Sequence, residues 1–360
     1  MDSRLKIPFR INRNVRINLP EQVADGFRQA IRSGYYKPGD VLPPRGEIAK
    51  ALGISMRIPR EAIRILAAEN LVCARRGVGC SVLAQKDRLW KGRVLIVERD
   101  MCAGSYYAAM VVNELRRKLL EAGYLYTNVC ADMKYDGRSF NLVPVAEALR
   151  QPTDFVFAVY PTMNLVRFLR RRVPFMCNGD DIEAEELVPM DWMPAREHLI
   201  QDCRRKGVHR ILVARFGDSD GELDMFRSAG FEVEDLTVWP NNRFDYLAAT
   251  EQGALEAVRE RFAPGKPRPD LVYFADDYVA RGGLMALMSL GVKVPNEMKV
   301  VSLTNHGFEP SFPIPLARIE YDPVVNGAFV AKCVISRLEG LPQPEPIADS
   351  RYIPGDSFPM

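Results

Sequence analysis

The sequence lacks the patterns that mark several large classes of protein. Its seven cysteines are scattered and include no C-x-x-C pair, which argues against a disulfide framework and favours reduced thiols. No apolar run approaches the roughly 20 residues that a membrane-spanning helix needs. The first ten residues are charged throughout and contain no apolar stretch, so we expect no signal peptide and a cytoplasmic location.

Motifs of common enzyme classes are absent as well. There is no G-x-x-x-x-G-K-[ST] phosphate loop and no G-x-S-x-G nucleophile turn. His198, His209 and His306 are isolated and show no metal-ligand spacing. The segment 218–221 resembles the start of a calcium loop, but Ala229 stands where the bidentate glutamate belongs. We therefore expect no enzyme activity, no cofactor and no metal site.

The charge of the chain is unevenly distributed. Its 360 residues carry a net charge of +3, and a length of this order predicts two or three domains. Residues 1–92 contain 18 basic and 8 acidic residues, a net of +10, whereas the remainder contains 31 basic and 38 acidic residues, a net of −7. This asymmetry indicates a polyanion partner for the N-terminal part, with a solvated basic face as the alternative.

Apolar spacing predicts three helices and a hairpin after a basic, extended arm at 1–18. The first helix carries an apolar stripe from Val23 to Ile31 and ends at Ser33-Gly34. A second runs over 45–52, and a third from about Ser55, a good N-cap residue, to about Asn70. Two β-type runs, 71–74 and 80–83, follow with a Gly-containing turn between them.

Helix, helix, turn, helix and hairpin form the plan of a winged helix-turn-helix domain. The last of these helices enters the DNA major groove in that plan, while the hairpin contacts the backbone. Arg64 lies on the same helix face as Arg57 and Arg60. Two roles are open for it, a DNA contact or an ion pair on a solvated helix face. The residues that we expect to contact DNA are Arg45, Ser55, Met56, Arg57, Arg60, Arg75, Arg76 and Gly79.

The stretch from Leu19 to Leu83 resembles the GntR-type winged helix. The resemblance implies sequence-specific DNA binding. The chain departs from the family pattern at Pro44-Arg45-Gly46 and at Met56–Pro59, which changes the expected target sequence. The matching residues include Gln22-Val23-Ala24, Lys37-Pro38-Gly39-Asp40, Leu42-Pro43, Glu47-Ile48-Ala49, Leu52-Gly53-Ile54-Ser55, Arg60-Glu61-Ala62-Ile63 and Leu71-Val72.

After residue 92 the chain alternates short apolar strands with amphipathic helices. Repeated strand–helix–strand units predict an α/β fold with parallel sheets and helices on both faces. About 268 residues are too many for one such sheet, so two lobes are expected. The expected strands are 94–98, 125–129, 155–160, 175–177, 211–214, 271–275 and 300–304.

This region resembles the effector domain of LacI/GalR-type repressors, a two-lobed relative of periplasmic sugar-binding proteins. The resemblance is carried by Asp270–Ala280, Gly283–Pro295, Val300–Leu303 and Pro315–Ile319. It implies a linker at 85–92 and an effector domain at 93–360. One lobe would span about 93–190 with about 318–350, and the other about 191–317.

A ligand site is expected at the strand ends that face the cleft between the lobes. The segment 217–221 is short, the arginine-containing ligand helix of the family is reduced to about 222–229, and Asp276 replaces the usual asparagine. For each candidate, a loop or helix-cap role is an open alternative. The candidates are Tyr106, Tyr107, Asn178, Asp180, Asp276, Asp277, Thr304 and Asn305.

Together the resemblances imply a ligand-responsive DNA-binding regulator. We expect a repressor that binds a small carbohydrate-like effector and, as a homodimer, a roughly palindromic double-stranded operator. In the alternative, the C-terminal domain only dimerises, binds a ligand that is not a sugar or retains an undetected enzymatic activity. No membrane partner is expected.

Overall fold

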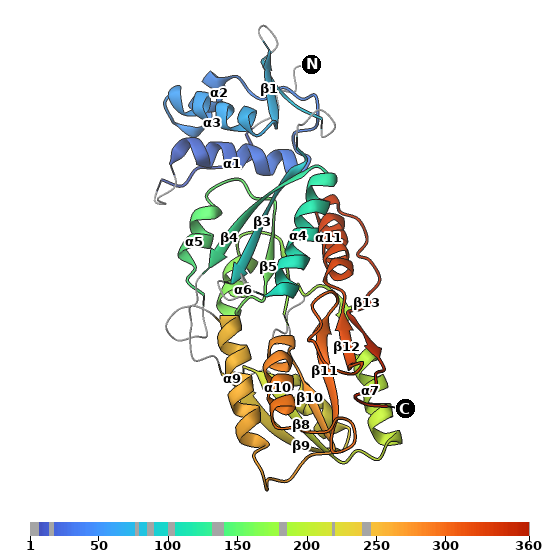
Figure 1. Cartoon of the computed structure of the whole chain (residues 1–360). Helices are drawn as coiled ribbons and strands as arrows, with labels where there is room; N and C mark the ends of the chain where they lie inside the picture. The colour runs from blue at the N-terminus through green and yellow to red at the C-terminus, as the bar shows by residue number, and fades with distance from the viewer. Residues whose placement is uncertain are drawn as a thin grey trace. The chain divides into compact units, whose positions relative to one another are not determined.

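A computed structural model of the chain divides into two compact units (Figure 1). The first holds the chain up to Arg93 together with Gly123–Leu125, and the second holds Val94–Ala122 together with the chain from Tyr126 onward. The residues that the structure describes are 7–13, 18–75, 79–84, 90–99, 105–131, 140–179, 186–217, 220–239 and 246–359.

The first unit has the predicted winged helix-turn-helix plan. Its hairpin strands pair antiparallel, with Val72 opposite Val82. Gly53 ends the second helix at φ 62°, in the left-handed region that favours glycine. The elements of this unit are α1 (Leu19–Arg32), α2 (Arg45–Leu52), α3 (Arg57–Ala68), β1 (Val72–Arg75) and β2 (Gly79–Val82).

Helix α3 begins at Arg57, one residue later than a Ser55 N-cap would place it. Met56, not Ser55, precedes the first helical residue, and no side chain caps the helix. The N–H of Ile58, one of the two donors that a Ser55 side-chain cap could use, donates to the Ser55 carbonyl at 3.0 Å. Pro59, in the first turn, has no N–H to offer. The expected N-cap role of Ser55 was therefore wrong.

The first lobe of the second unit is built on a sheet with the strand order β4-β3-β5-β6. Strands β3, β5 and β6 run parallel, and every residue of β5 is buried, as expected for a central strand covered on both faces. The elements are β3 (Gly92–Arg99), α4 (Tyr106–Glu121), β4 (Tyr124–Ala131), α5 (Val143–Ala148), β5 (Phe155–Val159), α6 (Met163–Arg170) and β6 (Phe175–Asn178).

The second lobe is built on a sheet with the strand order β14-β12-β11-β10-β8-β9. The strands run parallel except β14, which pairs antiparallel with β12. None of the helices in the described ranges is both long and apolar enough to cross a membrane. The elements are α7 (Met193–Arg205), β8 (Arg210–Phe216), α8 (Gly221–Ser228), β9 (Glu232–Val238), α9 (Tyr246–Arg261), β10 (Leu271–Phe274), α10 (Asp277–Ser289), β11 (Lys299–Asn305), β12 (Ala317–Tyr321) and β14 (Ser350–Ile353).

The chain crosses between the lobes later than the predicted position near residue 318. Strand β12 pairs with β11 and so belongs to the second sheet. Only after Asp322, which caps the next helix, does α11 (Pro323–Glu339) return to the first lobe, where it packs on α4 (Figure 1). The short strands β7 (Met190–Asp191) and β13 (Ile347–Ala348) pair beside this passage, and β14 then rejoins the second sheet.

Two glycines allow pairs of helices to approach closely. A Cβ added at Gly327 in α11 would lie 2.8 Å from the carbonyl oxygen of Val111 in α4. A Cβ added at Gly282 in α10 would lie 1.9 Å from the carbonyl oxygen of Glu251 in α9. Any other residue at these positions would push the helices apart. These contacts fix α11 on the first lobe and α10 on the second.

Candidate DNA-binding and ligand-binding sites

The N-terminal half of α3 presents a basic surface to solvent. Arg57 and Arg60 are exposed, and the side chain of Met56 is 57% exposed. On the opposite face, Ala62 and Leu66 are buried in the core of the unit. Because helix periodicity separates these two faces, the arginines project away from the core, where a DNA duplex could reach them.

Two further predicted contacts flank this surface. Arg45, the first residue of α2, and Ser55, before α3, are exposed. On the hairpin, Gly79 adopts φ 109°, and a Cβ there would lie 3.0 Å from Val41, so a glycine fits this position. Arg76 lies outside the described residues, as does the side chain of Arg75, so the basic hairpin tip remains a prediction.

The sequence left two roles open for Arg64, and the structure shows an ion pair. The Arg64 Nε–H donates to Glu61 at 3.0 Å one turn earlier on α3. The Arg64 side chain is 77% exposed, so the pair contributes little stability. Arg57 and Arg60 make no hydrogen bond or ion pair to any described residue. They therefore keep their donors for a partner.

A buried ion pair that the sequence analysis missed orients α3. Arg28 of α1 is 5% exposed and donates to both carboxylate oxygens of Glu69, at 3.0 and 2.8 Å. It also donates to Asp25 at 2.7 Å. Glu69 is the residue that ends α3, so this bidentate contact fixes the recognition helix against α1. A charged residue directly after buried Phe27 was the only sequence signal.

In the second unit, the two predicted aspartates begin α10. Asp276 caps the helix by accepting from the N–H groups of Tyr278 and Val279, at 2.9 and 3.0 Å. Its neighbour Asp277 accepts from the side-chain amide of Asn305 at 2.8 Å, and both of these residues are buried. Asp276 thus has the capping role that the sequence left open, while Asp277 and Asn305 come together from different elements.

These carboxyl groups are costly to ionise. Burial raises the pKa of Asp276, and the negative charge of Asp277 raises it further. Burial also raises the pKa of Asp277, although the hydrogen bond from Asn305 opposes this. The Oδ1 atom of Asn305 is buried and accepts no hydrogen bond from the described residues. A buried polar group without a partner is uncommon and is consistent with a place for a ligand donor.

Tyr106, at the start of α4, contacts the second lobe. Its ring stacks on Phe308 with centroids 4.8 Å apart. Its backbone N–H donates to the Tyr278 hydroxyl at 3.4 Å, and its own hydroxyl donates to the His306 carbonyl at 3.3 Å. Tyr106 therefore joins the lobes beside the α10 N-terminus, close to Asp277.

The predicted ligand residues Tyr107 and Asn178 make other contacts. Tyr107 packs edge-on against Tyr321, with centroids 5.6 Å apart, and its hydroxyl accepts from Asn326 at 3.1 Å. Asn178 is buried at the end of β6, where its side chain accepts from the Tyr160 N–H at 3.2 Å. These hydrogen bonds lead to Asn326 and Tyr160, not to Asp277. Asp180 lies outside the described residues.

Arg196 of α7 is a buried charged residue that the sequence analysis missed. It is 3% exposed and donates to Glu222 at 2.7 Å, to the Tyr321 hydroxyl at 2.8 Å and to the Trp192 carbonyl at 2.8 Å. These partners come from three separate segments, so Arg196 ties the start of α7 to α8 and to the end of β12. No sequence spacing could have predicted the contacts with Glu222 and Tyr321, which are 26 and 125 positions away.

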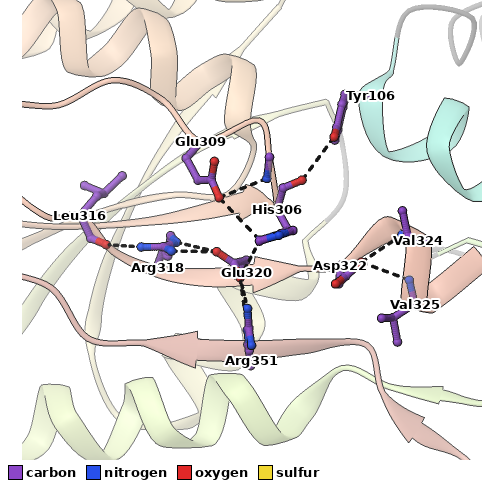
Figure 2. A network of polar contacts seen from close by, with 11 residues as sticks. Tyr106, His306, Glu309, Leu316, Arg318, Glu320, Asp322, Val324, Val325 and Arg351 are labelled. Carbon is purple, nitrogen blue, oxygen red and sulfur yellow. Dashed lines mark hydrogen bonds and ion pairs between the residues drawn. The ribbon is translucent and has the colours of Figure 1, made fainter.

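A second ion-pair network surrounds Glu320 of β12 (Figure 2). Arg318 donates to one carboxylate oxygen at 2.9 Å and Arg351 to the other at 2.6 Å. His306 and Glu309 complete a group whose ligand atoms lie within 4.8 Å of one another, as a metal site would need. Because two arginines already neutralise Glu320 and lower its pKa, the group is better explained as an ion-pair network.

Two protein families match separate parts of the chain. Residues 19–82 match the family described as "Bacterial regulatory proteins, gntR family". Residues 200–358 match the "Periplasmic binding protein-like domain". The GntR match covers the winged helix. The periplasmic binding protein-like match covers the second lobe together with helix α11.

Curated relatives resemble the N-terminal part of the chain. An uncharacterized HTH-type transcriptional regulator of Escherichia coli, YieP, is 34% identical over 70 residues, which are 19% of this chain and 30% of that protein. The uxu operon transcriptional regulator of E. coli is 40% identical over 63 residues, 18% of this chain and 24% of that protein. The chain thus spans less than a third of the length of these two relatives.

Solved structures resemble the remainder of the chain. A LacI family transcriptional regulator from Bifidobacterium animalis has a TM-score of 0.58 at 15% identity, covering 74% of this chain and 97% of that one. A LacI family regulator from Arthrobacter, solved in complex with lactose, has a TM-score of 0.57 at 17% identity, covering 74% of this chain and 99% of that one. This likeness shows the two-lobed fold.

Proposed function

We propose that the chain is a ligand-responsive transcription regulator, because residues 19–82 match the GntR family, residues 200–358 match a periplasmic binding protein-like domain, and 74% of the chain is similar in fold to a LacI family regulator. The observation that carries this proposal is the exposed basic start of α3 on a winged helix, in a chain that continues into a two-lobed domain. The proposal assigns no catalytic step to the chain and places it in the cytoplasm, with the DNA.

The proposed DNA interface centres on α3. Arg57 and Arg60 suit base edges or phosphates, because a guanidinium is a planar fork of donors. Met56 offers an apolar contact beside them. Arg45 and Ser55 lie at neighbouring element starts and suit the DNA backbone. The hairpin residues Gly79, Arg75 and Arg76 complete the predicted set.

The proposed effector is a small carbohydrate-like molecule. Sugars carry hydroxyl donors that pair well with buried carboxylate and amide oxygens, and apolar faces that stack on aromatic rings. Asp277, Asn305 and Tyr106 offer these groups around the start of α10, and the Asn305 Oδ1 atom is a ready acceptor. Tyr107, Asn178, Asp180 and Asp276 stay in the predicted set as secondary contacts.

In the proposed mechanism, the arrangement of the two lobes controls how the winged helix binds DNA. A ligand held beside Tyr106 and Asp277 would favour one arrangement of the two lobes, because these residues belong to different lobes. In a homodimer, such a change would alter how two α3 helices meet the half-sites of a palindromic operator. We propose that the outcome is repression that the effector relieves.

The proposal is tested by selecting duplexes from a random library with the full chain, with and without added sugars such as lactose. We expect a two-fold symmetric sequence to be enriched and a sugar to reduce its recovery. In parallel, the sugar that acts should raise the unfolding temperature of the full chain. Failure to enrich any duplex overturns the proposal. Enrichment that no sugar affects would favour a domain that only dimerises or binds another ligand.

A further inference from the structure

The segment Ile7–Arg13, the described part of the arm expected at 1–18 and called the arm from here on, lies outside the family match yet packs on the winged-helix unit. Ile7, Phe9 and Ile11 are half-buried against the core of that unit, whereas the residues between them are exposed. This alternation is the pattern of an extended strand with one face packed inward. The arm is therefore a docked part of the domain, although its sequence predicts only a basic extension.

Gly26 leaves the space on α1 in which the arm packs. The Phe9 ring packs edge-on against Phe27, with centroids 5.0 Å apart. A Cβ added at Gly26 would lie 2.3 Å from the Phe9 ring, which no real contact tolerates. Glycine weakens the interior of a helix relative to alanine, so its place here is explained by the room that Phe9 needs.

The end of the arm is fixed to the turn between α2 and α3. The backbone N–H of Asn12 donates to the Gln22 side chain at 2.8 Å. The Arg13 guanidinium donates to the Gly53 carbonyl at 2.7 Å. Because Gly53 ends α2 and Ser55 lies two residues further on, the Arg13 charge is held beside the start of the recognition helix.

A groove of about 440 Å³ opens at this place. Its lining includes Arg13, Gln22 and the exposed Ser55, and no aspartate or glutamate is among the described residues that line it. One guanidinium N–H group serves Gly53, while an arginine has five such donors. The groove thus offers a positive charge and a hydroxyl, without an opposing carboxylate, next to the predicted base-reading residues.

We propose that this groove holds a backbone phosphate of the bound duplex and that the docked arm delivers Arg13 to it. The proposal rests on the proposed DNA-binding function. Phosphate contacts of this kind set the register of a protein on DNA, and arginine pairs well with phosphate oxygens. Arg13 would then position α3 from a residue that the winged-helix family match does not include.

Substitutions at Arg13 separate its charge from its hydrogen bond to Gly53. Arg13→Gln keeps a donor for the carbonyl but removes the charge, whereas Arg13→Lys keeps the charge. The measurement is the affinity of the full chain for the selected duplex across a series of salt concentrations. For Arg13→Gln we expect roughly tenfold weaker binding at low salt and a salt slope smaller by about 0.9 per bound protomer, with most of the slope retained in Arg13→Lys.

The matched control is Arg227→Gln, in α8 of the other unit. Arg227 is an exposed arginine paired with Asp224 at 3.6 Å, so this variant removes the same charge far along the chain. We expect its affinity and salt slope to equal those of the unchanged chain. An Arg13→Gln variant that behaves like this control would overturn the proposal. A chain that binds no selected duplex would instead overturn the proposed function.

Gly26→Ala tests the delivery by the arm without changing any charge. Alanine favours helix α1, but its Cβ displaces Phe9 and therefore the arm. We expect weaker DNA binding and a reduced salt slope, as in Arg13→Gln, with an unchanged circular dichroism spectrum. Adding Arg13→Gln to Gly26→Ala should then cause little further loss. Full DNA affinity in Gly26→Ala would contradict delivery by the arm.

Discussion

The two units arrange their candidate functional residues in opposite ways. On the winged helix, Arg57 and Arg60 are exposed and make no polar contact within the described chain. In the second unit, Asp277 and Asn305 are buried and hydrogen-bond to each other. The exposed arginines keep their donors hydrated until DNA binds. A small polar ligand that binds at Asp277 and Asn305 must instead form hydrogen bonds with groups that are already buried. The difference predicts distinct costs for mutation in the two units.

The largest expected effect is on the stability of the winged helix, whose exposed DNA-binding surface depends on a buried charge. In Glu69→Ala, Arg28 would stay buried and lose its bidentate partner. We expect a loss of about 3 kcal/mol in the free energy of unfolding of the winged helix. Urea denaturation measures it. Glu61→Ala, which removes an exposed pair, is the control and should leave stability almost unchanged.

The second effect tests whether the exposed arginines of α3 contribute to DNA affinity without contributing to stability. The double variant Arg57→Ala with Arg60→Ala should weaken binding to the selected duplex by about 100-fold. Its unfolding temperature should not change, because both side chains are exposed. Arg64→Ala serves as the control on the same helix and should lose far less affinity. Equal losses in both variants would show that only overall charge matters.

The third effect concerns the cost of the buried carboxylates. Because burial raises the pKa of Asp276 and Asp277, the folded state holds their protons more tightly than the unfolded state does. Their favourable contribution is present at acid pH and is lost as the pH rises through the raised values. Asp277→Asn should therefore stabilise the second unit at pH 7 by about 1 kcal/mol while abolishing the effector response. Thermal unfolding from pH 4 to 8, with and without effector, measures both; a less stable variant would contradict this explanation.

The smallest effect tests the contact between the lobes. Tyr106→Phe keeps the stacking on Phe308 but removes the hydrogen bond to the His306 carbonyl. We expect a change of about 0.5–1 kcal/mol in effector binding, measured by calorimetry. Tyr106→Ala, which also removes the ring, should cost more. Identical affinities for all three chains would remove Tyr106 from the ligand site.

Local sequence patterns predicted the helices and strands better than they predicted the contacts between distant side chains. The helix over 45–52 and the hairpin follow from apolar spacing and turn residues, and the structure has them. Strand β9 was missed because it is charged and half exposed at the sheet edge, without a buried apolar run. The pairing of Arg28 with Glu69 spans 41 positions and that of Arg196 with Tyr321 spans 125, so no local period reveals them.

The placement of α11 has a consequence for the order in which the protein is made. The first lobe needs this helix, since Gly327 seats it within reach of the Val111 carbonyl on α4. Yet α11 follows β12, so the ribosome releases nearly all of the second lobe before the first can be completed. A nascent chain that ends before Pro323 would leave α4 uncovered and its apolar face open to chaperones.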